Sequence, residues 1–170
     1  MGRHPDRIRR GGIRQILEIG CGPGQLAALL GEQGVTGYVG LDFSPQAIAM
    51  ARENVLGARF VVGDARSPRV HDEVEHDSVI CTEVLEDLGD DLRVVSGFRP
   101  GKRCFCSVPS FTDPSHVRHF RDAAEVVARY GPFFRDLDVA SFASPRSDPH
   151  ARYDFFLFDG VRNDHVIPES

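Results

Sequence analysis

Three acidic residues each follow a short apolar run, and each has the chemistry for ligand binding or proton transfer. They are Asp42, Asp64 and Glu83. An ionised carboxylate offers two acceptor oxygens, so it can hold a pair of hydroxyl groups, bind an amine or take a proton from a substrate. The runs before these acids have the length of buried strands. We therefore expect all three acids at strand ends.

A glycine-rich turn precedes these acids. Residues 16–19 form an apolar run that contains one acid, Glu18, and then Gly20, Gly22 and Gly24 alternate before leucines at helical spacing. Glycine allows a positive φ and lets a ligand approach without a Cβ in the way. The free N–H groups at the start of the following helix favour an anionic group. The pattern predicts a strand, a ligand-binding turn and a helix, with a plain glycine-rich connection as the alternative.

Length and composition are those of an ordinary globular protein. The chain has 170 residues, of which 41% are hydrophobic and 26% charged, with a net charge of −5 and a pI near 5.8. This length favours a single domain over residues 1–170. No apolar run approaches the ~20 residues that span a bilayer, and the N-terminus lacks the apolar stretch of a signal peptide, so we expect a cytoplasmic protein without a membrane partner.

The net negative charge of the chain gives it no general electrostatic attraction to nucleic acid, so no nucleic-acid partner is expected. Five arginines nevertheless crowd the N-terminus, where a solvated terminus or a phosphate-binding arm would account for them. They are Arg3, Arg7, Arg9, Arg10 and Arg14. The cysteines show no C-x-x-C spacing, so buried thiols are expected rather than a metal site. They are Cys21, Cys81, Cys104 and Cys106.

Seven strand-like runs alternate with helical patterns. The strands are predicted at residues 16–19, 38–41, 58–62, 77–81, 103–108, 134–142 and 153–159. Helices are predicted after Gly24, from Pro45 to Val55, at 90–98 and around 123–130, and Ser44 is predicted to cap the second. This rhythm predicts an α/β three-layer sandwich. In an open parallel sheet with crossover helices, the strand ends share one edge, which is where such folds bind ligands.

One ligand would engage the glycine turn and the strand-end acids together: a nucleoside with a charged tail. Asp42 would accept both ribose hydroxyls, and Asp64 would accept from an amine of the base. The Ala65 backbone N–H would donate to a ring nitrogen. Phe43 would cover one face of the base, and the glycine turn would hold the tail.

The chain carries four short motifs in the order LEIGCGPG, LDFS, VGDA and ICTEVLEDL. They resemble the motifs of class I S-adenosylmethionine-dependent methyltransferases, most closely the small-molecule methyltransferases of the ubiquinone-biosynthesis type. The resemblance covers about residues 13–108. It implies S-adenosyl-L-methionine as the cofactor, S-adenosyl-L-homocysteine as the product, and a Rossmann-like, mostly parallel sheet of order 3-2-1-4-5-7-6 with an antiparallel seventh strand.

Residue by residue, the glycine turn corresponds to the methionine-binding motif, Asp42 to the ribose-binding acid, and Asp64 with Ala65 to the adenine site. Cys81 corresponds to the residue whose backbone lies beside the methionine moiety. The expected cofactor-binding residues are Glu18, Gly20, Cys21, Gly22, Gly24, Asp42, Phe43, Asp64, Ala65 and Cys81.

A nicotinamide-dependent dehydrogenase is the nearest competing interpretation, because it also pairs a glycine turn with an acid on the second strand. Its fingerprint is G-x-G-x-x-G, whereas this chain has Gly20, Gly22 and Gly24, with Leu26 where a further glycine would stand. A dinucleotide site also has no use for Asp64. The methyltransferase interpretation is therefore preferred.

Methyl transfer from a sulfonium is an in-line displacement, in which alignment of the reactants supplies much of the acceleration. A hydroxyl nucleophile would also gain from a general base. Candidates at the same sheet edge include Glu83 after the fourth strand and His116 after the fifth, and these two are the predicted catalytic residues. The other candidates are Glu86, Asp87, His119, Arg146 and His150.

Relatives often read E-x-L-E-H in the fourth motif, and Asp87 stands here in place of the histidine. The two glutamates and two histidines of this edge could together hold a metal through oxygen and nitrogen ligands, as in small-RNA 2′-O-methyltransferases. The further signature residues of that group are absent, so no metal is predicted. Whether a base or a metal assists the reaction stays open.

The acceptor is also open. A small metabolite is the favoured acceptor, and a protein or RNA acceptor and a non-catalytic cofactor-binding module are the alternatives. The first strand begins near Ile13, which leaves almost no N-terminal lid of the kind that relatives carry. We expect an open enzyme with a large substrate, a cover from a second copy in a homodimer, or a shortened version of the fold.

Overall fold

The computed structural model describes residues 15–143 and 154–166. Seven strands are ordered β3-β2-β1-β4-β5-β7-β6. Contacts group the chain into two compact units that divide within β4, between Ile80 and Cys81. The predicted α/β class, strand order and antiparallel seventh strand are confirmed.

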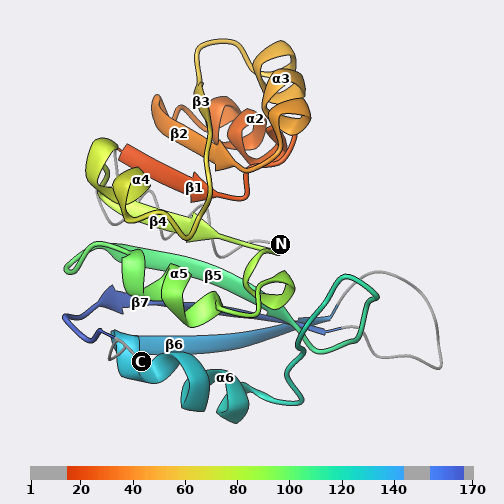
Figure 1. Cartoon of the computed structure of the whole chain (residues 1–170), viewed down its shortest axis with the longest axis vertical. Coiled ribbons are helices and arrows are strands. Elements are labelled where there is room, and N and C mark those ends of the chain that lie inside the picture. Colours follow the sequence, from red (N-terminus) through yellow and green to blue (C-terminus); the bar gives the residue numbers. More distant parts are fainter. Residues whose placement is uncertain (1–14, 144–153, 167–170) are drawn as a thin grey trace. The chain divides into compact units, whose positions relative to one another are not determined.

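The first unit alternates strands and helices. Its elements are β1 (Gln15–Ile19), α2 (Gln25–Glu32), β2 (Gly37–Asp42), α3 (Pro45–Asn54), β3 (Arg59–Val62), α4 (Pro68–Glu73) and most of β4 (Ser78–Cys81). Strand β2 pairs in parallel with β1 and β3, so that Glu18 lies opposite Gly40 and Asp42 lies opposite Val62. Helix α3 packs against β2 and β3 (Figure 1). This parallel arrangement brings the ends of β1, β2 and β3 to one edge.

Helix starts in the first unit follow from their first residues. Helix α2 begins after Gly24, whose φ of 88° is in the left-handed region. Helix α3 begins at Pro45, and the Ser44 hydroxyl accepts from the Ala47 N–H at 3.2 Å, which confirms the predicted cap. Both helices therefore start immediately after a strand-end turn.

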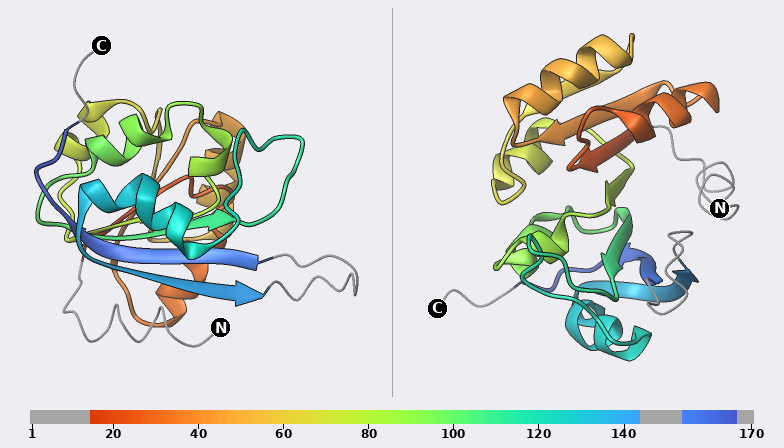
Figure 2. Two further views of the ribbon diagram at one scale, coloured as in Figure 1. Left: turned by 90° about the horizontal axis from the view of Figure 1, so that it is seen from below. Right: turned by 90° about the vertical axis from the view of Figure 1, so that its right-hand side faces the viewer.

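The second unit contains an antiparallel group of strands. Its elements are η1 (Leu85–Asp87), α5 (Asp91–Gly97), β5 (Arg103–Pro109), α6 (Ala123–Tyr130), η2 (Gly131–Phe133), β6 (Phe134–Ala143) and β7 (Asp154–Arg162). Strand β7 is antiparallel to both β5 and β6. Helix α6 lies along β6 (Figure 2), and Asp122 caps it by accepting from the Glu125 N–H at 3.0 Å.

The strand predictions agree with the structure to within one or two residues, except at the end of β7, which continues to Arg162. The sequence did not locate helix α4. All four cysteines are buried and none forms a disulfide, as expected. Arg146, His150 and the N-terminal arginines lie outside the described residues, and the single-domain assignment stays a prediction. Among the helices of the described ranges, none has the length and apolar character required to cross a bilayer.

Candidate functional site

The glycine turn between β1 and α2 is tied to the end of β2. Gly20, Gly22 and Gly24 have φ values of 75°, 52° and 88°. The Gly20 and Cys21 N–H groups donate to the Leu41 carbonyl at 2.8 and 2.9 Å. All three glycines adopt a conformation that L side chains rarely take, which explains the alternate spacing seen in the sequence.

Asp42 connects this turn with the start of α3. Its Oδ2 accepts from the Gly22 N–H and its Oδ1 from the Ser44 N–H, each at 2.9 Å. A carboxylate has about four lone-pair sites, so each oxygen can still accept a further hydrogen bond. Asp42 is half-buried at the strand end. Its carboxylate can therefore hold the turn and still receive two hydroxyl groups.

Glu18 is buried in β1, and only 3% of it is exposed. The Tyr38 hydroxyl donates to Glu18 Oε2. Burial raises the pKa of Glu18 to about 7, the Tyr38 hydrogen bond offsets part of that rise, and the negative charge of Asp42 adds to it. Burial, with Glu18 and Asp42 nearby, also raises the pKa of Cys21 to about 12, so this thiol stays protonated.

Tyr38 and Gly40 are site residues that the sequence reasoning missed. The two residues lie two positions apart on β2. The parallel register places both on the face of the sheet to which Glu18 of β1 points. A Cβ on Gly40 would lie 2.8 Å from both Cys21 Cβ and Cys21 Sγ. The absence of a side chain at position 40 therefore lets the glycine turn lie against β2.

The predicted base-binding residues lie around the ends of β2 and β3. Phe43 is 81% exposed, so its ring can cover a ligand. The Gly63 N–H donates to the Asp42 carbonyl at 2.9 Å, which ties the turn after β3 to the end of β2. Asp64 Oδ1 accepts from the Arg66 N–H at 2.9 Å and lies 3.3 Å from Arg66 Nη1, a contact that the sequence did not predict. Ala65 is half-buried beside it.

Glu83, at the end of β4, has an unusual backbone and a side-chain partner. Its φ is 56°, in the left-handed region that non-glycine residues rarely adopt. The Ser107 hydroxyl donates to Glu83 Oε1 at 2.8 Å, and the Glu83 N–H donates to the same hydroxyl oxygen at 3.1 Å. Strained backbone of this kind often occurs at functional sites, where it directs a side chain to a position that it could not reach from a relaxed turn.

The charge of His116 acts on the carboxyl group of Glu83. Partial desolvation of the carboxyl group raises the pKa of Glu83, while the Ser107 hydrogen bond and the charge of His116 lower it, and Asp87 raises it. His116 Nδ1 lies 3.3 Å from the Phe111 carbonyl oxygen, and the two rings are 5.6 Å apart. The charge of one predicted catalytic residue therefore acts on the carboxyl group of the other.

Glu86 is a third acid of this group and is only 1% exposed. Burial raises its pKa to about 8, and the neighbouring Glu83 and Asp87 add to the rise. Among the described residues, none donates a hydrogen bond to its Oε2. Glu86 is therefore largely protonated near neutral pH. The next residue, Asp87, differs from Glu86 in being exposed to solvent.

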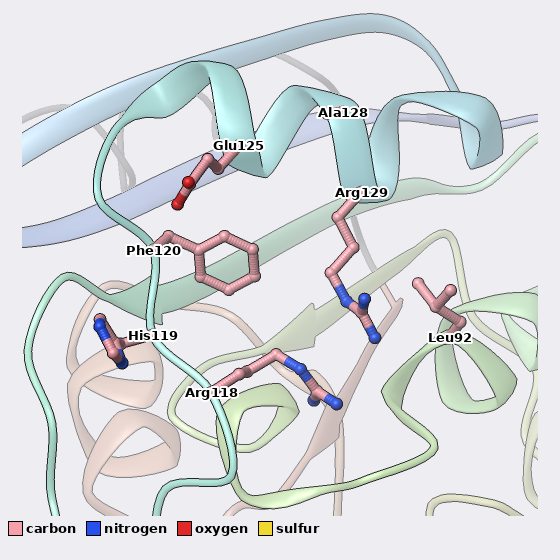
Figure 3. A pocket seen from close by; sticks show the side chains of 7 residues that line it. All are labelled: Leu92, Arg118, His119, Phe120, Glu125, Ala128 and Arg129. Atoms are coloured by element: carbon pink, nitrogen blue, oxygen red, sulfur yellow. The ribbon is translucent and has the colours of Figure 1, made fainter.

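His119, the second histidine of this stretch, is exposed. It lines an open pocket of about 570 Å³ between α5 and α6, together with Arg118, Phe120, Glu125 and Arg129 (Figure 3). Of the predicted site residues, this pocket includes His119 alone. Cys81 is buried in β4 near Cys106. Within the ranges that the structure describes, no three His, Cys, Asp or Glu side chains gather closely enough to hold a metal ion.

Comparison with known proteins identifies the family. A family model described as a methyltransferase domain matches residues 16–98. The chain is 31% identical over 135 residues to a trans-aconitate 2-methyltransferase of Rhizobium leguminosarum bv. trifolii, covering 76% of this chain and 50% of that protein. It is also 31% identical over 152 residues to a ubiquinone biosynthesis O-methyltransferase of Xylella fastidiosa, covering 80% of this chain and 61% of that protein.

Among solved structures, an S-adenosylmethionine-dependent methyltransferase from Archaeoglobus fulgidus has the same fold, with a TM-score of 0.64 at 18% identity over 92% of each chain. The chain spans about half the length of the curated relatives it matches. The matched segment contains the glycine turn, Asp42, Asp64 and Glu83 in the predicted order. By its motifs, its strand order and these matches, the chain belongs to the class I S-adenosylmethionine-dependent methyltransferases.

Proposed function

We propose that this chain binds S-adenosyl-L-methionine and transfers its methyl group to a small-molecule acceptor. The observation that carries the proposal is the hydrogen bond of 2.9 Å between the Gly22 N–H and Asp42 Oδ2. It joins the turn expected to hold the charged tail to the acid expected to hold the ribose. A plain connecting loop would not require a half-buried carboxylate to be fixed against it.

The residues of the first unit fit the proposed cofactor. The positive-φ glycines present backbone without side chains, Asp42 has acceptor capacity for two hydroxyls, and the exposed Phe43 ring can cover a base. Asp64 keeps its Oδ2 for an amine while Oδ1 accepts from Arg66. When bound, the cofactor would supply an electrophilic methyl group on a sulfonium.

Glu83 and His116 are the proposed catalytic residues. Ser107 orients the Glu83 carboxyl group, and partial desolvation raises its pKa toward the range in which a carboxylate accepts a proton efficiently. His116, whose charge acts on that carboxyl group, would share the proton taken from the acceptor. The chain's own contribution is then alignment of the acceptor and temporary storage of one proton.

The names of the relatives support a small acceptor, since one is named for trans-aconitate and the other for ubiquinone biosynthesis. A homodimer and the absence of a metal stay predictions. So does the expectation that nucleic acid is not a partner.

Isothermal calorimetry with S-adenosylmethionine tests the site directly. Asp42→Ala is expected to lower the affinity at least about 100-fold, because the change removes both ribose acceptors and frees the turn. The matched control is Glu53→Ala on the exposed side of α3, which should bind like the wild type. Unchanged affinity in a folded Asp42→Ala protein would refute the proposed site.

A screen with cofactor carrying a radiolabelled methyl group tests the acceptor class. Fractionated cell extract would be incubated with the protein, and label would be followed into small molecules, protein and RNA. Label in small molecules supports the proposal, and label in protein or RNA replaces the proposed acceptor class. Cofactor binding without label in any fraction favours a non-catalytic module.

A further inference from the structure

The segment from Ser115 to Phe120 alternates in burial. Val117 and His119 are exposed, whereas His116 and Arg118 are half-buried and Phe120 is buried. The side chains of His116, Arg118 and Phe120 are therefore the more buried ones of this segment. Phe120 fixes one end, since its N–H donates to the Pro109 carbonyl at 3.0 Å and its ring lies 5.8 Å from the Tyr130 ring.

Arg118 attaches this segment to the turn that follows Glu83. Its Nη1 donates to the Leu85 carbonyl at 2.6 Å and to the Leu88 carbonyl, and its Nη2 donates to the Gly89 carbonyl at 3.0 Å. The backbone adds two bonds, because the Val117 and Arg118 N–H groups both donate to the Glu86 carbonyl, at 2.8 and 3.3 Å. One guanidinium thus satisfies three carbonyls of residues 85–89.

Asp91 anchors that guanidinium in turn. Its carboxylate is fully buried at the start of α5, and Oδ1 lies 3.2 Å from Arg118 Nη1. The same carboxylate accepts from Arg129 Nε and the Tyr130 hydroxyl of α6, at 2.8 and 2.7 Å. Arg118 and Arg129 approach each other from the segment and from α6 (Figure 3). The position of Arg118 is therefore fixed from two helices.

We propose that Arg118 is a positioning residue of the transfer reaction, which holds His116 at a fixed distance from Glu83. His116 lies two residues before Arg118, and Glu83 lies two residues before Leu85, the first of the carbonyls that Arg118 holds. The inference rests on the proposed function, in which Glu83 and His116 handle the proton of the acceptor. A lysine would not serve here, since one ammonium cannot reproduce the planar fork that reaches three carbonyls.

The competing explanation is a purely structural clamp, in which Arg118 stabilises the turn and the distance from His116 to Glu83 has no importance. Carboxyl 13C NMR of Glu83 separates the two. The groups that face Glu83 are Ser107, His116, Asp87 and Glu86. His116 belongs to the segment of Arg118, whereas Asp87 and Glu86 belong to the turn whose carbonyls its guanidinium holds, so a double variant that also lacks His116 is needed to isolate the effect of His116. Because His116 lowers the pKa of Glu83, release of the segment should raise that pKa.

The experiment compares Arg118→Met, His116→Gln and the double variant. We expect the pKa of Glu83 to rise in Arg118→Met, in the same direction as in His116→Gln, and the double variant to match His116→Gln alone. In turnover assays, kcat should fall about ten-fold or more in Arg118→Met, with the acidic limb of its pH profile moved upward, while the KM for the cofactor changes less than about two-fold. Arg118→Lys should fall between wild type and Arg118→Met.

The matched control is Arg121→Met, which removes an exposed arginine of the same stretch that pairs with Glu125. It should leave kcat and the Glu83 titration unchanged. Arg118→Lys keeps the positive charge beside Asp91 and serves as the test variant if Arg118→Met does not fold. An unshifted Glu83 pKa in a folded Arg118 variant, or effects of Arg118→Met and His116→Gln that add, would overturn the proposal.

The NMR titration needs neither cofactor nor turnover, so the two ideas fail separately. If the wild type transfers no methyl group and Glu83 still responds to Arg118, the proposed function is wrong and the geometric coupling stands. If the wild type is active and Glu83 does not respond, only the role of Arg118 is wrong.

Discussion

Glu18 shows what the fold does to a single carboxyl group. Burial between β1 and β2 raises its pKa from 4.5 to about 7, against the opposing hydrogen bond from Tyr38. The folded chain therefore holds this proton more tightly than the unfolded chain does. That contribution to stability is complete below pH 4.5 and is lost as the pH rises through 7. A shift from 4.5 to about 7 corresponds to roughly 3 kcal/mol.

Glu18→Gln should remove this pH dependence. Glutamine cannot ionise, and its side-chain oxygen can still accept from the Tyr38 hydroxyl. In urea unfolding, we expect the variant to gain about 2 kcal/mol relative to the wild type between pH 5 and pH 8. The exposed Glu53→Gln on α3 is the control and should track the wild type. An equal difference from wild type at both pH values would show that Glu18 is not protonated on folding.

At the scale of elements, β2 can approach the glycine turn only because position 40 lacks a side chain. Gly40→Ala would place a Cβ 2.8 Å from Cys21 Cβ and from Phe60 Cδ1. We expect a loss of about 1–3 kcal/mol in unfolding free energy, because overpacking forces the turn or β3 to move. Cofactor affinity should fall as well, since Cys21 belongs to the turn. Calorimetry and urea unfolding measure the two effects.

Gly31→Ala is the matched control for that change. A Cβ at Gly31, near the end of α2, has no atom within 4 Å. Alanine costs less conformational entropy than glycine in a helix, so this variant should be as stable as the wild type or about 0.5–1 kcal/mol more stable. Equal destabilisation by both variants would contradict the packing argument at Gly40.

The elements also show which features the sequence predicts and which it does not. The first five strands are predictable because each is a mainly apolar run of four to six residues that ends at or near a glycine, a proline or an acid. Ser44 likewise predicts the start of its helix. Helix α4 was missed because Pro68–Glu73 is short and has too few apolar positions to show a helical period. Strand β7 runs past Asp159 because Gly160 continues the pairing with Cys104 instead of ending it.

The candidate site also has features that the sequence predicts and features that it does not. Motif order predicts the roles of Asp42 and the glycine turn, because both lie close in sequence to strand ends. The partnership of Tyr38 with Glu18 depends on strand register, which the motifs do not reveal. Arg118 bonds to carbonyls about thirty positions away, and a carbonyl leaves no mark on residue type. Such contacts appear only when the chain is folded.

For the whole molecule, cofactor binding should act as a source of stability. A ligand that binds only the folded chain adds about 2.7 kcal/mol at 100 times its Kd. We expect saturating S-adenosylmethionine to raise the melting temperature by about 5–10 °C in a chain of this size. Differential scanning calorimetry measures the shift, and Asp42→Ala should abolish it. A similar rise in Asp42→Ala would place the ligand elsewhere on the chain.

The hydrogen bonds from Gly22 and Ser44 to Asp42 also bear on the catalytic cycle. They fix the conformation of the turn in the folded chain before a ligand binds. Binding therefore does not have to order a flexible loop, and the affinity is not reduced by that loss of conformational entropy. The product can then dissociate, and a new cofactor molecule can bind to a site whose conformation does not change between turnovers. Replacement of the product by the cofactor after each turnover should therefore be fast.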